Sequence, residues 1–110
     1  MTVAGQKGDH AMSRRDSSRI TSALHRQYRE AARAGDWRRC FELAERLRGL
    51  ERDDALAAEA VYAYGLALEM LGDAKRAAVQ YQTALMLDRR NAKARRRLAR
   101  LNVKRGPPGR

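Results

Sequence analysis

Apolar residues return every three or four positions along most of this chain, which is the spacing of one face of an α-helix. The first such face is formed by Ile20, Leu24, Tyr28 and Ala31. Ser17 or Ser18 is a suitable N-cap for it, and Gly35 is typical of the position just past a helix end. The pattern therefore predicts a first helix from Ser17 to about Gly35.

The same periodicity predicts four more helices, at about 37–49, 55–71, 74–88 and 92–105. Asp36, Asp73 and Asn91 stand where the N-caps of the second, fourth and fifth helices are expected. The residues expected to point inward are, in chain order, Trp37, Cys40, Phe41, Ala44 and Leu47; Ala57, Val61, Tyr64, Leu68 and Leu71; Ala77, Tyr81, Ala84 and Leu85; and Ala94, Leu98 and Leu101.

The two ends of the chain lack this periodicity. Residues 1–16 combine glycine with mixed charges and predict a disordered leader, with Met12 as an alternative start to Met1. Residues 106–110 carry a Gly-Pro-Pro-Gly run and predict a flexible tail. One helical domain over 17–105 is therefore expected.

Two Gly-Asp pairs indicate an internal repeat. Gly35-Asp36 and Gly72-Asp73 lie 37 residues apart, and each pair follows one predicted helix and precedes another. Self-similarity at this period is typical of solenoids built from helix pairs. The clearer copy is a unit of 34 residues at 58–91.

This unit resembles the tetratricopeptide repeat (TPR). The family's pattern is a large residue, a Leu-Gly pair, an aromatic residue and then a small–aromatic–small triplet. The residues in these places are Val61, Tyr64, Gly65, Leu68, Ala77, Tyr81 and Ala84. Arg89 replaces the closing proline of the family. Gly65 and Ala77 are small where the resemblance brings two helices close together.

A weaker copy covers about 21–57, with Tyr28 in the glycine place and Cys40 in the place of the small alanine. Residues 92–105 resemble the first half of a third repeat that serves as a basic capping helix. The resemblance implies an all-α fold, in which five helices form an antiparallel, right-handed solenoid of helix pairs.

In this family the first helices of successive pairs line a concave groove that binds a partner. The implied groove residues are His25, Arg26, Arg29 and Arg33; Tyr62, Leu66 and Met70, with Glu59 and Glu69 beside them; and Lys93, Arg96, Arg97 and Arg100. An apolar strip would thus lie between two basic walls and hold an extended or helical peptide, whose carboxylates pair with the arginines. Arg97→Glu with Arg100→Glu is then expected to abolish binding and to leave helicity intact. Packing within the protein, or contact with another copy, would equally explain the apolar strip.

Charge is distributed unevenly along the chain. The net charge is +11, from 24 basic and 13 acidic residues, and residues 88–110 hold ten basic side chains against Asp88 alone. Such asymmetry favours an anionic partner, which is an acidic peptide, a nucleic acid or an anionic membrane surface. The membrane surface is the least favoured, because the core needs the narrow apolar stripe of the fifth helix. Arginine outnumbers lysine 20 to 4, so a GC-rich genome is an alternative explanation with no functional meaning.

Motifs for catalysis find little support in the sequence. The histidines are His10 and His25, and the single cysteine, Cys40, falls at a predicted helix contact. The sequence has no glycine-rich, phosphate-binding loop before a helix. We therefore expect no enzyme, and assign no catalytic, cofactor or metal residue. The sequence shows no membrane-spanning apolar run and no signal-peptide pattern, which predicts a cytoplasmic protein.

These observations predict an adaptor or scaffold that binds an acidic peptide segment of another protein. One alternative is RNA binding through the basic fifth helix, although no aromatic residue follows Tyr81 to stack on bases. The other alternative is a subunit that assembles with copies of itself.

Overall fold

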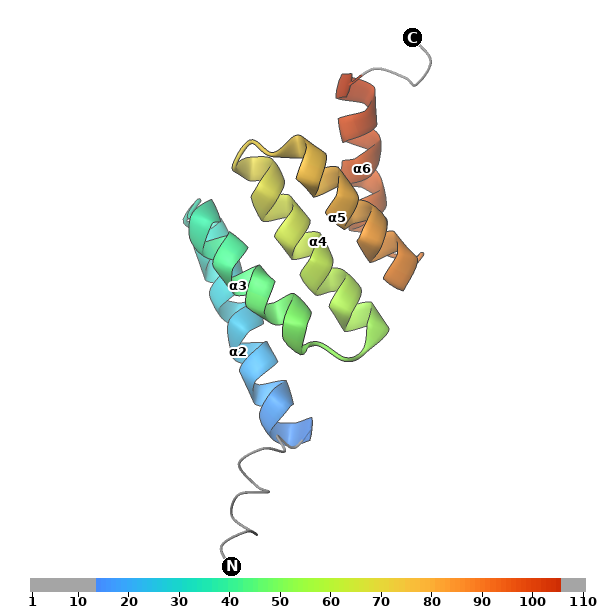
Figure 1. The fold of residues 1–110 in the computed structure, drawn as a ribbon. Coiled ribbons are helices and arrows are strands. Elements are labelled where there is room, and N and C mark those ends of the chain that lie inside the picture. The colour runs from blue at the N-terminus through green and yellow to red at the C-terminus, as the bar shows by residue number, and fades with distance from the viewer. Residues whose placement is uncertain (1–13, 106–110) are drawn as a thin grey trace, which may run out of the picture.

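The computed structural model describes residues 14–105, and this part of the chain is built from helices joined by short links (Figure 1). The helices are α2 (Arg14–Arg33), α3 (Trp37–Leu50), α4 (Asp54–Met70), α5 (Ala74–Leu87) and α6 (Ala92–Arg105). The described residues form no β-strand. Within residues 14–105, the predicted all-helical class and the five predicted helices are therefore confirmed.

The start of the first helix differs from the prediction. Helix α2 begins at Arg14, so Ser17 and Ser18 lie inside it and the expected serine cap is wrong. No glycine or proline separates Arg14 from the apolar face, so nothing in the sequence ends the helical conformation there. The remainder of the predicted leader and the predicted tail at 106–110 lie outside the described residues.

Both Gly-Asp pairs end one helix and begin the next, as the sequence predicts. Gly35 and Gly72 have φ of +74° and +97°, a conformation that L side chains rarely adopt. Asp36 and Asp73 then accept hydrogen bonds from the backbone N–H three residues further on, at 3.2 and 3.1 Å. Asn91 caps α6 in the same way, since its Oδ1 accepts from the Ala94 N–H at 3.0 Å.

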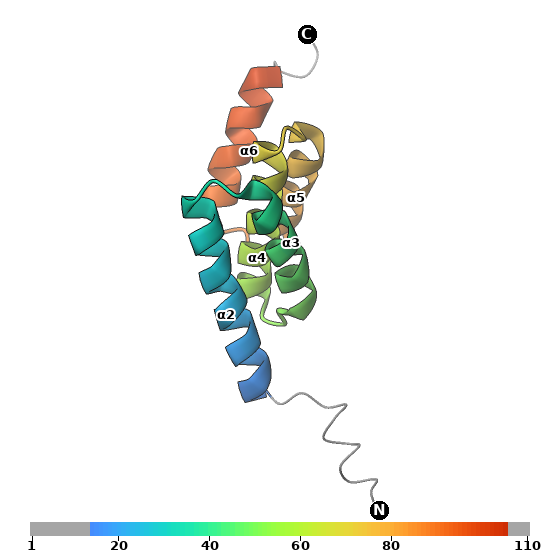
Figure 2. The same cartoon turned by 90° about the vertical axis from the view of Figure 1, so that its left-hand side faces the viewer.

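Each helix packs against the next one in the chain, and α4 lies in the centre, in contact with both α3 and α5. Figure 2 shows α2 and α6 on one side of the molecule and α3 and α5 on the other, with α4 between them. One buried cluster joins the first three helices through Leu24, Ala31, Cys40, Leu43, Leu47, Ala60 and Ala67. A second cluster joins α4, α5 and α6, and Tyr64 and Tyr81 are its largest buried side chains.

The predicted inward faces are largely confirmed, but more residues are buried than were predicted, including Ala58, Ala60 and Ala67 on α4. Leu43 is 2% exposed although its position was not predicted to be buried. Helix α3 packs against both α2 and α4, so its buried arc is wider than a single stripe. Leu71 is 44% exposed, because it is the C-cap residue after Met70, where the chain leaves the core.

Gly65 lies where α4 and α5 approach each other closely. A Cβ at this position would lie 2.9 Å from Cε1 of Tyr81 and 3.0 Å from Cβ of Gln80. We expect Gly65→Ala to lower the free energy of unfolding by about 1 kcal/mol, because overpacking outweighs the gain in helix propensity. Urea denaturation followed by circular dichroism measures this change.

Gly49 on α3 is the matched control for Gly65. It is exposed, and a Cβ there would meet no atom within 4 Å. Gly49→Ala is expected to raise the free energy of unfolding by about 0.5–1 kcal/mol, through helix propensity alone. A stabilisation of similar size at Gly65 would show that the two helices can separate freely there.

Candidate functional site

The candidate site is the exposed side of α2, α4 and α6, called here the α2–α4–α6 face. It comprises His25, Arg26, Arg29, Arg33, Tyr62, Leu66, Met70, Lys93, Arg96, Arg97 and Arg100. Helix α2 is held to α4 by the Tyr28 hydroxyl, which donates to the Ala63 carbonyl oxygen at 2.9 Å. Helix α6 is held to α4 by several polar side chains.

Lys93 lies against the acidic side of α4. Its Nζ is 2.9 Å from Glu59 Oε1 and 5.3 Å from the centre of the Tyr62 ring. The Asn91 amide donates to the other oxygen of Glu59 at 2.9 Å. Lys93 therefore already has a carboxylate partner within the protein.

Arg97 is engaged even more fully. Its Nε and Nη2 donate to the two carboxylate oxygens of Glu69 at 3.2 and 2.9 Å, and the Tyr81 hydroxyl donates to the same carboxylate at 2.7 Å. The hydrogen bond to Glu69 raises the pKa of Arg97, while burial and then the Glu69 bond raise the pKa of Tyr81. The guanidinium thus stays charged and the phenol stays neutral.

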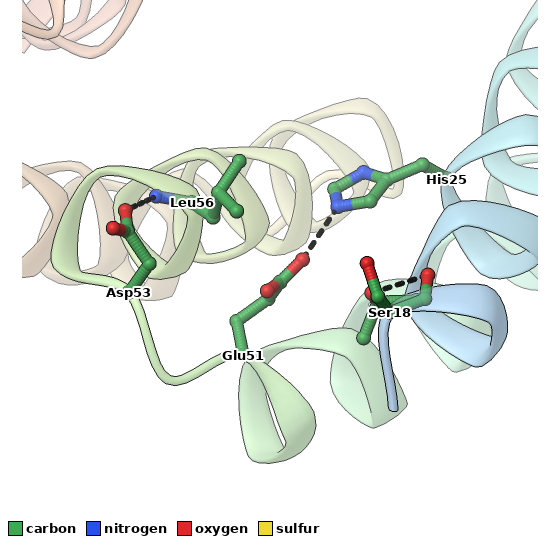
Figure 3. A network of polar contacts seen from close by, with 6 residues as sticks. Ser18, His25, Glu51, Asp53 and Leu56 are labelled. Atoms are coloured by element: carbon green, nitrogen blue, oxygen red, sulfur yellow. Dashed lines mark hydrogen bonds and ion pairs between the residues drawn. The ribbon is translucent and has the colours of Figure 1, made fainter. Parts of the chain in front are cut away.

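His25 also has an internal partner. Its Nε2 is 3.0 Å from Oε2 of Glu51, whose side chain is only 7% exposed (Figure 3). Figure 3 shows the histidine reaching from α2 to the link that follows α3. The nearby Asp53 caps α4 by accepting from the Leu56 N–H at 3.1 Å. The contact between His25 and Glu51 therefore connects α2 to the link between α3 and α4.

Five arginines of the face remain exposed, and none of them makes an ion pair with another described side chain. They are Arg26, Arg29 and Arg33 on α2 and Arg96 and Arg100 on α6. Between these two groups, Leu66 is half-buried and Met70 is 41% exposed. Tyr62 is more enclosed, since its ring lies 5.7 Å from that of Tyr81, and burial raises its pKa.

The prediction of two basic walls thus needs a correction. Lys93, Arg97 and His25 are engaged by carboxylates that lie 34, 28 and 26 residues away in the sequence. Periodicity reveals the direction of a side chain on its helix, but it does not reveal which distant charge the side chain meets. The acidic residues Glu59 and Glu69, beside the predicted strip, were the signal that pointed to the pairs of Lys93 and Arg97.

Among the described residues, no three His, Cys, Asp or Glu side chains gather in a way that could hold a metal ion. Cys40 is fully buried at a helix contact, as predicted, and burial raises the pKa of its thiol. Within residues 14–105, no helix is both long and apolar enough to cross a membrane.

No protein-family model, curated protein or solved structure matches this chain. The resemblance to the tetratricopeptide repeat therefore stays a prediction.

Proposed function

We propose that the protein is a non-catalytic adaptor of the tetratricopeptide-like kind, which binds an acidic segment of a partner protein on the α2–α4–α6 face. The observation that supports this function most is the set of five exposed arginines on either side of Leu66 and Met70. The carboxylates of Glu59 and Glu69 on α4 are engaged by Lys93 and Arg97. The five arginines therefore remain able to pair with carboxylates of a partner.

Several contacts must act together on such a face. An exposed ion pair contributes only about 0.2–1 kcal/mol, so no single arginine supports useful affinity. Burial of Leu66 and Met70 against apolar side chains of the partner adds a contribution that salt does not screen. A segment with both carboxylates and apolar residues is therefore the partner that fits.

The test is a double charge reversal, Arg96→Glu with Arg100→Glu, and a fluorescent acidic peptide containing leucine as the probe. Removing two attractions and adding two repulsions should weaken binding about tenfold, as measured by fluorescence anisotropy. Arg97 is unsuitable for this purpose, because its reversal would break the Glu69 contact and disturb the fold.

Arg38→Glu with Arg46→Glu on α3 is the matched control. Both arginines are exposed and belong to α3, the helix on the other side of the molecule, and their reversal gives the same change in net charge. Binding should change less than about twofold in this variant, since it leaves the local charge of the face intact. Equal weakening in both variants would argue against a specific face. Binding of an RNA oligonucleotide in place of the peptide would move the function to nucleic acid.

A further inference from the structure

We infer that the partner segment binds as an amphipathic α-helix with acidic residues on both flanks, and not as an extended strand. This inference rests on the proposed function and concerns the conformation and sequence pattern of the partner. It comes from the hydrogen-bonding capacity, the shape and the charge pattern of the α2–α4–α6 face.

The carboxylates of Glu59 and Glu69 on α4 are already engaged within the protein, which makes them poor acceptors for the backbone of an extended segment. An extended chain presents an N–H group and a carbonyl group at every residue, and those turned toward the protein need partners. Among the described side chains, Glu59 and Glu69 already accept from Lys93, Asn91, Arg97 and Tyr81. Asn91 has both ends of its amide engaged as well, because its Oδ1 accepts from the Ala94 N–H.

A helical segment does not need these acceptors. Its backbone N–H and carbonyl groups are satisfied within the helix, and only its side chains meet the face. The exposed groups that remain are arginines, which donate to carboxylates, and the apolar side chains of Leu66 and Met70. This composition suits the side chains of a helix better than the backbone of a strand.

The apolar residues of α4 also have the spacing of a helix ridge. Tyr62, Leu66 and Met70 follow one another at steps of four, and such rows pack into the grooves between the side chains of a second helix. Helix α4 lies between α2 and α6 in Figure 1, and Figure 2 shows α2 and α6 on the same side of it. A partner helix along α4 would therefore have the exposed arginines of α2 and of α6 on its two sides.

The arginines indicate where the acidic residues of the partner belong. Arg29 and Arg33 are one helical turn apart on α2, and so are Arg96 and Arg100 on α6. The matching helix has an apolar stripe and, on each side of it, carboxylates one turn apart. A second copy of this chain does not supply such a helix from residues 14–105. Its one helix with a net negative charge, α4, is packed in the core between α3 and α5.

Two synthetic peptides of about 18 residues test the inference, and each would span roughly 27 Å as a helix. The first carries leucine at positions i, i+4 and i+8 with glutamate on both flanks. The second is identical except for two central prolines. With the full-length protein, the first peptide should bind and gain helical circular dichroism. The second should bind at least about tenfold more weakly, because proline breaks a helix.

The outcomes separate the inference from the function on which it rests. Equal affinity for both peptides, lost in the Arg96→Glu, Arg100→Glu variant, would overturn the helical partner and keep the acidic-segment function. Absence of binding to either peptide would overturn both. A strong preference for the first peptide, weakened in that variant and unchanged in the α3 control, supports the helix.

Discussion

Replacing Leu47 with alanine should lower the free energy of unfolding by about 2–5 kcal/mol, the range for a fully buried leucine. Leu47 is 0% exposed and belongs to the cluster that joins α2, α3 and α4. Small domains are stable by only about 5–15 kcal/mol, so this single truncation should remove a large share of the total. Urea denaturation followed by circular dichroism gives the change directly.

Cys40 provides an independent measurement of the same change. It is fully buried in the same cluster as Leu47, and burial raises the pKa of its thiol. Since thiol reagents react with an exposed thiolate, Cys40 should be labelled only when this part of the protein opens. Leu47→Ala should therefore accelerate the labelling of Cys40 in the absence of denaturant.

Leu56→Ala is the control for Leu47→Ala, because it removes the same atoms from a side chain that is 48% exposed. Its cost should stay below about 1 kcal/mol, since much of this leucine already contacts water. Similar losses for the two variants would contradict the central place given to Leu47.

Local sequence signals predicted most of the helices correctly. Glycine allows the positive φ at Gly35 and Gly72, and the aspartate that follows each of them caps the next helix. Both effects involve only neighbouring residues, so the sequence alone reveals them. The predicted start of α2 was wrong because capping residues also occur inside helices, and no glycine or proline lies between Arg14 and Ser17.

The candidate site was predicted less completely, because its charges meet across long stretches of sequence. Lys93 and Arg97 were predicted to line the groove, but their engagement by Glu59 and Glu69 depends on how two helices lie together. A basic residue on a predicted groove can bind a partner or can stabilise the fold through an internal ion pair. Only its distance from the nearest carboxylate distinguishes these roles.

Arg97→Glu distinguishes them by experiment and should lower the free energy of unfolding by about 2 kcal/mol, because hydrogen bonds to a charged group are lost. Only 21% of the Arg97 side chain and 15% of the Glu69 side chain are exposed, so water compensates the loss poorly. The new carboxylate would also face Glu69. Urea denaturation measures the change, and Arg96→Glu, which breaks no described ion pair, should stay within about 0.5 kcal/mol.

A charge swap completes this experiment. Combining Glu69→Arg with Arg97→Glu restores opposite charges between α4 and α6, so the double variant should recover part of the lost stability. Failure to recover would mean that the Arg97 side chain contributes through packing and through its exact geometry with Tyr81. If Arg97→Glu instead cost no more than Arg96→Glu, Arg97 would have no structural role. It would then join the arginines of the α2–α4–α6 face that are left for the partner.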